Sequence, residues 1–93
     1  MRLNLKIQGG SAVFDKKIFG ARLRALREEK GMTASQLGRV MGITSTQVGD
    51  MEKGNSATSM ARLYDLCVFF EVSADYLLGL TEGTSGTGEQ PPM

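Results

Sequence analysis

The chain has 93 residues, of which 41% are hydrophobic, enough for one small domain with a single core of four or five short helices. It has no histidine and one cysteine, Cys67, which removes the commonest general base, a His- or Cys-based metal site and an internal disulfide. No apolar run approaches the ~20 residues of a membrane span. We therefore expect no enzyme activity, no cofactor, no metal and no membrane contact, and a location in the reducing cytoplasm without a signal peptide.

The net charge is only +1, but it is unevenly distributed along the chain. Residues 1–55 hold ten of the eleven Lys and Arg residues and five acidic residues, a net charge of +5. Residues 56–93 hold Arg62 and five acidic residues, a net charge of −4. A basic half beside an acidic half suits a polyanion bound on one face, although chance clustering of charges on solvated surfaces gives the same pattern.

The chain opens with a possible strand. Leu3, Leu5 and Ile7 alternate with polar residues, and Gly9-Gly10 follows as a hinge. No second strand is expected elsewhere, so residues 1–14 are interpreted as an N-terminal arm. Its simplest partner is the same strand of a second protomer in an antiparallel contact, and the alternative is an arm without structure.

A first helix is predicted over about residues 16–30, capped by Asp15 and ended by Gly31. Helical spacing places four apolar residues on its inner face: Ile18, Phe19, Leu23 and Leu26. Four basic residues are expected to face water: Lys16, Lys17, Arg22 and Arg24.

Two short helices joined by a tight turn are predicted over residues 33–54. Thr33 with Gln36, and Thr44 with Gln47 eleven residues later, match the capping box that starts a helix. In such a box the hydroxyl and the amide side chain each bond a backbone N–H of the first turn. The two starts therefore place one short helix directly after another.

The turn between these helices is predicted at Gly42, in a left-handed conformation that costs glycine little. Gly38 is expected to let the second helix cross the first closely. Five apolar residues complete the pattern: Leu37, Met41, Ile43, Val48 and Met51. This arrangement is the helix-turn-helix motif.

Two more helices follow. One is predicted from about Ser59 to Phe70, with five residues at helical spacing: Met60, Leu63, Tyr64, Cys67 and Phe70. Cys67 is interpreted as a core residue, because no base is present to activate its thiol. Ser73 caps a last short helix, which Gly79 closes. Residues 81–93 are rich in Gly, Ser, Thr and Pro and are predicted to be a disordered tail, which leaves a domain over residues 15–80.

Four segments in order resemble the lambda-repressor/Cro family of bacterial and phage DNA-binding domains: LRALREEKGMT, QLGRVMGIT, VGDMEKGN and ARLYDLCVFFEVSADYLLGL. The resemblance covers about residues 16–80. It implies an all-α, five-helix, lambda-repressor-like domain whose third helix enters the DNA major groove, usually as a homodimer on a near-palindromic operator. It also implies a structural ion pair between Arg27 and Glu52, and the alternative is two independent surface charges.

The outward face of the third helix follows from its spacing, because Val48 and Met51 point inward. Four residues are predicted to contact base edges: Ser45, Thr46, Gln47 and Asp50. The side chain of Gln47 is also expected to take part in the capping box with Thr44. Five residues are predicted to contact phosphates: Thr33, Arg39, Thr44, Lys53 and Asn55.

The chain departs from the family pattern at four positions: Ala34, Gly49, Asp50 and Thr58. Ala34 replaces a long polar residue, Gly49 and Asp50 replace polar or basic groups, and Thr58 replaces a proline. We predict a sequence-specific, double-stranded DNA-binding transcriptional regulator, a repressor or an antitoxin. The alternative is a helix-turn-helix fold kept as a protein-interaction module, with Gly49 and Asp50 facing another protein.

A homodimer is expected, because one small domain cannot read both halves of a near-palindromic site. Two surfaces are candidates for its interface. The first is the N-terminal arm, through two copies of residues 3–7. The second is a C-terminal patch made by three residues: Tyr76, Leu77 and Leu80.

Overall fold

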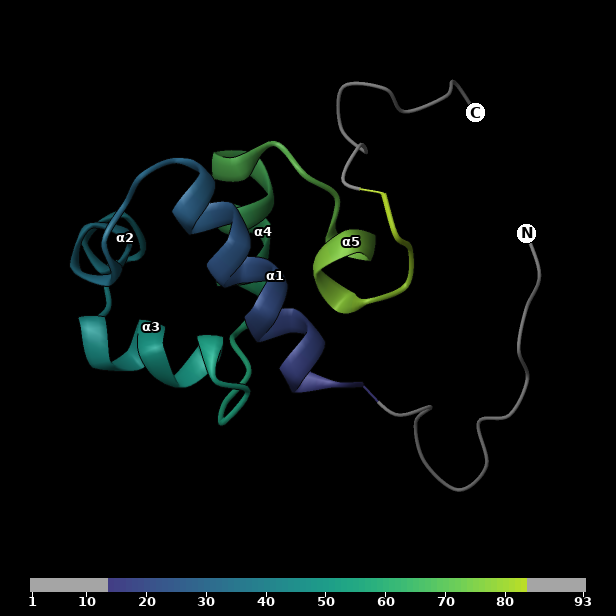
Figure 1. Ribbon diagram of the computed structural model, residues 1–93, viewed down its shortest axis with the longest axis horizontal. Helices are drawn as coiled ribbons and strands as arrows, with labels where there is room; N and C mark the ends of the chain where they lie inside the picture. The colour runs from purple at the N-terminus through teal and green to yellow at the C-terminus, as the bar shows by residue number, and fades with distance from the viewer. Residues whose placement is uncertain (1–13, 84–93) are drawn as a thin grey trace.

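A computed structural model describes residues 14–83, and within that range the protein is all-α, with five helices and no strand. The helices are α1 (Lys16–Glu29), α2 (Ala34–Met41), α3 (Ser45–Glu52), α4 (Met60–Phe70) and α5 (Ala74–Leu78). Figure 1 shows α1 running through the middle of the view, with α2 and α3 on one side and α5 on the other. The predicted all-α fold is confirmed. The possible strand at residues 3–7 and the tail beyond residue 83 lie outside the described residues.

The helices begin where side chains replace missing backbone partners. Asp15 accepts a hydrogen bond from the Lys17 amide at 2.9 Å at the start of α1. Ser59 and Ser73 cap α4 and α5 in the same way, accepting bonds of 3.1 and 3.0 Å. The caps at Asp15 and Ser73 were predicted from sequence and are confirmed. Ser59 was predicted only as the approximate start of α4, and the structure shows that it is the cap.

All five helices contribute to one core. Its buried members are Phe19, Leu23, Leu26, Leu37, Val48, Met51, Leu66, Cys67, Phe70, Val72 and Leu77. Cys67 lies in this core, and burial raises the pKa of its thiol. Leu77 is completely buried, so it cannot form the predicted C-terminal dimer patch with Tyr76 and Leu80.

The predicted inner face of α4 was wrong at Met60 and Tyr64, which are 80% and 69% exposed. The inner face instead consists of Leu63, Leu66, Cys67 and Phe70. Both sets have helical spacing, because α4 is apolar on two sides. Periodicity alone therefore did not identify the side that faces the core.

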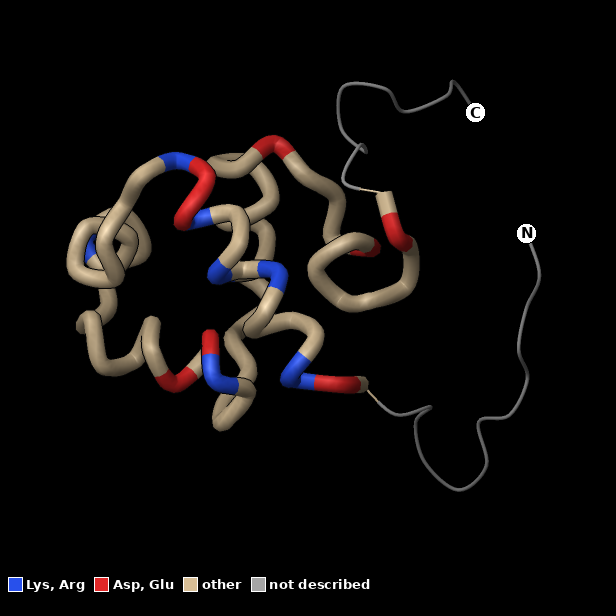
Figure 2. The backbone as a smooth tube through the Cα atoms, viewed as in Figure 1, with Lys and Arg blue, Asp and Glu red and all other residues tan. Residues whose placement is uncertain are grey.

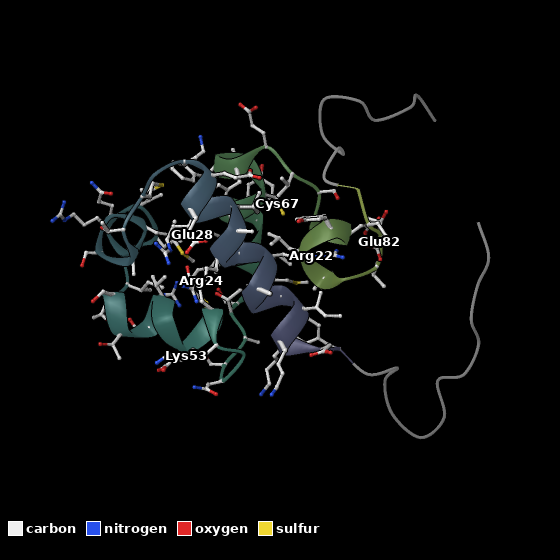
Figure 3. The ribbon with its side chains drawn as sticks, in the orientation of Figure 1. Arg22, Arg24, Glu28, Lys53, Cys67 and Glu82 are labelled. Carbon is white, nitrogen blue, oxygen red and sulfur yellow. The ribbon has the colours of Figure 1, made fainter. Side chains whose placement is uncertain are left out.

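Two residues of α1 also differ from expectation. Ile18 is 38% exposed and lies against Gly79 at the edge of the core. Arg22 was expected to face water, yet its side chain is only 17% exposed. Its Nη1 donates to the carbonyl oxygens of Tyr76 and Thr81, both at 2.6 Å. Figure 3 shows Arg22 directed toward α5 and Glu82. The chain after α5 returns beside α1 and covers this guanidinium.

Two glycines allow backbone segments to approach closely. A Cβ at Gly38 would lie 2.6 Å from the carbonyl oxygen of Ile43, so the turn that leads into α3 rests on α2 there. A Cβ at Gly20 would lie 2.6 Å from the carbonyl oxygen of Glu52. Thus α1 crosses the C-terminal end of α3 at Gly20, a contact that was not predicted from sequence.

Within residues 14–83, no helix is long and apolar enough to cross a membrane. The same residues contain no group of three or more His, Cys, Asp or Glu side chains placed to hold a metal ion.

Candidate nucleic-acid interface

The α3 helix is held by one face and presents the other to solvent. Its residues Val48 and Met51 are buried and belong to the same core as Leu37 of α2. Ser45 and Thr46 are exposed at its first turn. The eight residues form a helix about 12 Å long, and an α-helix about 10–12 Å across fits the B-DNA major groove, which is about 12 Å wide. The helix therefore has the size and the exposed polar end that major-groove reading requires.

The start of α3 is fixed by a reciprocal capping box. The Gln47 amide donates to the Thr44 hydroxyl oxygen at 3.0 Å, and Gln47 Oε1 accepts from the Thr44 amide at 2.9 Å. A bidentate contact to adenine needs both the oxygen and the nitrogen of the side-chain amide. While the box is closed, Gln47 can offer only its NH₂ group. Gln47 is therefore a positioning residue that retains the two N–H donors of its side-chain NH₂ group.

The start of α2 repeats this arrangement. The Gln36 amide donates to the Thr33 hydroxyl oxygen at 3.0 Å, and Gln36 Oε1 accepts from the Thr33 amide at 2.8 Å. A hydroxyl that accepts a bond through its oxygen still has a hydrogen to donate. Thr33 is exposed, so that hydrogen is available to a phosphate oxygen.

The opposite end of α3 carries the other predicted phosphate contacts. Lys53 is the C-cap of α3, and Asn55 follows in the next turn, where its amide donates to the Asp50 carbonyl oxygen at 2.9 Å. Both side chains are exposed, as is Arg39 in the last turn of α2. Figure 3 shows Lys53 at the end of α3. The predicted phosphate contacts thus flank α3 at both ends and continue onto α2.

A polar hollow of about 320 Å³ lies beside α3 and brings Gln47 and Asp50 together with Arg62 of α4. Arg62 was not among the predicted contacts, because in sequence it belongs to the acidic half of the chain. The path of the loop over residues 53–59 determines where Arg62 lies, and no local sequence signal indicates that path. Arg62 adds a cation to the lining of the hollow that Asp50 also lines.

The charges divide along the molecule. Figure 2 shows Lys and Arg positions on α1, on α2 and at the end of α3. It shows Asp and Glu positions on the turn after α4 and around α5, where few basic residues accompany them, and also on α1 and α3, where Asp50 and Glu52 lie. The α5 end of the described chain is therefore acidic, and α3 lies away from it (Figure 1). A polyanion that approaches α3 avoids this acidic end.

Gly49 is not required by the packing of α3. A Cβ built there meets no atom within 4 Å, and its backbone conformation is helical. Glycine within a helix costs roughly 1 kcal/mol relative to alanine. Packing within the described domain therefore gives no steric reason for glycine at this position.

Arg27 and Glu52 lie together between α1 and the end of α3. Arg27 Nε donates to Glu52 Oε2 at 2.6 Å, and Arg27 Nη2 donates to Glu52 Oε1 at 2.9 Å. Their side chains are 14% and 7% exposed. Arg27 also donates to the Met32 carbonyl oxygen at 2.7 Å. The hydrogen bonds to Glu52 raise the pKa of Arg27. This ion pair fixes α3 relative to α1 and leaves the exposed face of α3 free.

Comparison with known proteins places this arrangement among related chains. A family model described as helix-turn-helix matches residues 23–77. The uncharacterized HTH-type transcriptional regulator YazB of Bacillus subtilis is 35% identical over 63 residues, which are 68% of this chain and 91% of YazB. A second B. subtilis protein of the same description, YobD, is 36% identical over 61 residues, 66% of this chain and 54% of YobD.

Solved structures show the same likeness. The restriction-modification controller protein C.AhdI of Aeromonas hydrophila has a TM-score of 0.60 and 30% identity, over 68% of this chain and 91% of that chain. The P22 c2 repressor, whose structure is a complex with a synthetic operator, has a TM-score of 0.62 and 26% identity, over 66% of this chain and 92% of that chain.

Proposed function

The chain belongs to the helix-turn-helix family, and on that basis we propose that it regulates transcription by binding duplex DNA sequence-specifically, with α3 in the major groove. The observation that carries the proposal is the presentation of α3. Its inner residues Val48 and Met51 are buried, while Ser45 and Thr46 are exposed at the end that a groove-reading helix points toward the bases. The likeness to the operator-bound P22 c2 repressor supports the same reading.

The proposed contacts fall into two classes. Base edges are contacted by Ser45, Thr46, Gln47 and Asp50. Phosphates are contacted by Thr33, Arg39, Thr44, Lys53 and Asn55, with Arg62 as an addition. A carboxylate such as that of Asp50 accepts from the amino group of cytosine, whereas it repels phosphate, so it belongs with the base contacts.

The proposed assembly is a homodimer on a near-palindromic operator in the cytoplasm. One copy of α3 is about 12 Å long and spans only one major-groove segment. Two copies one helical turn apart, about 34 Å, read two half-sites of opposite orientation. The symmetry of the DNA site then mirrors the two-fold symmetry of the protein.

A protein-interaction module is the second candidate, and one observation favours it. Gly49 and Asp50 together form a small, acidic segment on the presented face of α3, where a phosphate-lined groove favours larger basic groups. A partner protein that lies against Gly49 also accounts for the missing side chain. The proposed DNA function and this alternative make opposite predictions for duplex binding.

Selection from a random duplex library with the full chain tests the proposal. We expect enrichment of a site with two inverted half-sites whose centres lie about 10 base pairs, or a multiple, apart. Recovery of no common sequence, together with no binding to any duplex at low salt, would reject the DNA function and favour a protein partner.

A further inference from the structure

An exposed apolar stripe runs along α4. Met60, Tyr64 and Val68 are 80%, 69% and 57% exposed. They are spaced four residues apart, so their side chains follow one another at intervals of about 6 Å on one side of the helix. We call these three residues the α4 stripe. Contiguous apolar surface on a small domain marks a place where another segment packs.

An apolar hollow of about 290 Å³ adjoins the first residue of the α4 stripe. It is lined by Met60 together with Phe14, Phe19, Leu63, Leu78 and residues 57–59. Phe14 is the first described residue, and its ring centroid lies 6.3 Å from that of Phe19. The chain that precedes Phe14 therefore starts from the Met60 end of the α4 stripe.

The sequence of that preceding chain matches the α4 stripe in spacing. Leu3, Leu5 and Ile7 occupy every second position, so on extended backbone their side chains recur about 6.6 Å apart on one face. This interval is close to the 6 Å of the stripe. The six residues between Ile7 and Phe14 reach about 20 Å when extended, and they include Gly9-Gly10, where the chain can reverse direction.

The charges are complementary as well. Residues 1–8 carry Arg2 and Lys6 and no acidic side chain. Glu71, directly after α4, is exposed and follows the line of the stripe. If Ile7 lies at Met60 and Leu3 at Val68, then Arg2 comes level with Glu71.

We propose that residues 3–7 pack along the α4 stripe of their own chain, antiparallel to α4, with Leu3, Leu5 and Ile7 covering Val68, Tyr64 and Met60. The same-chain arrangement follows from the exit point. A segment tied by six residues to the end of its site is present there at a millimolar effective concentration, which a second copy reaches only in concentrated solution. This inference does not depend on the DNA function.

Nuclear Overhauser effects in the full-length, isotope-labelled protein test the proposal. We expect cross-peaks from the methyl groups of Leu5 to the ring of Tyr64 and from those of Leu3 to Val68. A second sample of labelled and unlabelled chains mixed in equal amounts, recorded with isotope filtering, should lack them. Absence of the cross-peaks from the first sample would overturn the proposal. Their presence in the filtered sample would also overturn it, because the stripe would then hold the segment of a second copy.

Two substitutions provide a matched comparison. Leu5→Ser should shift the resonances of Tyr64 and Val68 toward those of a chain that lacks residues 1–8. Asn4→Ser, one residue away on the opposite face of the segment, should leave them unchanged. Equal shifts for both variants, or none for either, would contradict the side-chain register proposed here. Neither residue belongs to the core or to the proposed DNA contacts, so both variants keep the fold.

Discussion

At the scale of one residue, substitution of Gly49 should change the stability of the domain and its affinity for DNA in opposite directions. Because a Cβ there meets no atom within 4 Å, Gly49→Ala should stabilise the domain by about 0.5–1 kcal/mol. If DNA lies close to α3 at this point, the added methyl group should at the same time weaken duplex binding. Thermal unfolding and fluorescence anisotropy with a selected duplex measure the two effects.

Gly38→Ala is the control for Gly49→Ala, since a Cβ at Gly38 would lie 2.6 Å from the Ile43 carbonyl oxygen. It should lower stability. If Gly49→Ala leaves duplex affinity unchanged, then DNA does not approach α3 at Gly49.

Thr58 provides a stability test at the scale of one residue. Among the described residues its Oγ1 is inaccessible to solvent and has no hydrogen-bond partner. Thr58→Val keeps the side-chain shape and removes this unpaired group, so we expect a gain of about 1 kcal/mol in the free energy of unfolding, or roughly 4–8 °C in melting temperature.

Thr44→Val is the matched control for Thr58→Val. The Thr44 hydroxyl accepts the Gln47 amide at 3.0 Å, so its removal should cost about 1 kcal/mol. A loss at Thr58 similar to that at Thr44 would show that the Thr58 hydroxyl is satisfied.

At the scale of elements, the pair of Arg27 and Glu52 joins α1 to the end of α3. Arg27→Met leaves the carboxylate of Glu52, which is 7% exposed, without its partner and should lower the free energy of unfolding by about 3 kcal/mol. Arg24→Met breaks the exposed pair of Arg24 and Glu28, whose side chains are 63% and 54% exposed, and should cost less than about 0.5 kcal/mol. Urea unfolding of both variants gives the comparison. Equal midpoints for the two would show that the buried pair contributes no stability.

The predictable elements were those set by near neighbours. The caps at Thr33 and Thr44 connect residues three apart, so the sequence alone located the starts of α2 and α3. Arg22 illustrates the opposite case. Its partners Tyr76 and Thr81 lie more than fifty positions away, and they contribute backbone carbonyls, which every residue has. No residue type marks such a contact in advance.

The same distinction applies to the candidate site. The exposed face of α3 followed from helical spacing, because Val48 and Met51 were the only apolar side chains there. Arg62 reaches that face through the fold of the loop before α4, so charge counting along the chain misassigned it. On α4, apolar side chains on two sides left the inner face undecided until the packing of α1 and α5 was known.

At the scale of the whole molecule, the uneven charge should appear in the salt dependence of binding. Three proposed phosphate contacts are cations, Arg39, Lys53 and Arg62, which makes six in a homodimer. Counterion release then predicts a slope of about −5 in a plot of log affinity against log salt concentration. Lys53→Ala in both protomers should bring the slope about two units closer to zero. A duplex affinity that does not change with salt would contradict a phosphate-contacting role for this face.

The central claim is that the first turn of α3 reads bases, and the most direct measurement compares the sequences selected from a random duplex library by the wild type, Thr46→Ala and Lys53→Ala. We predict that Thr46→Ala relaxes or changes the preferred base at one position in each half-site. Lys53→Ala should weaken binding to all sequences about equally and leave the preferred sequence unchanged. An unchanged preference for Thr46→Ala, or an altered one for Lys53→Ala alone, would contradict the account.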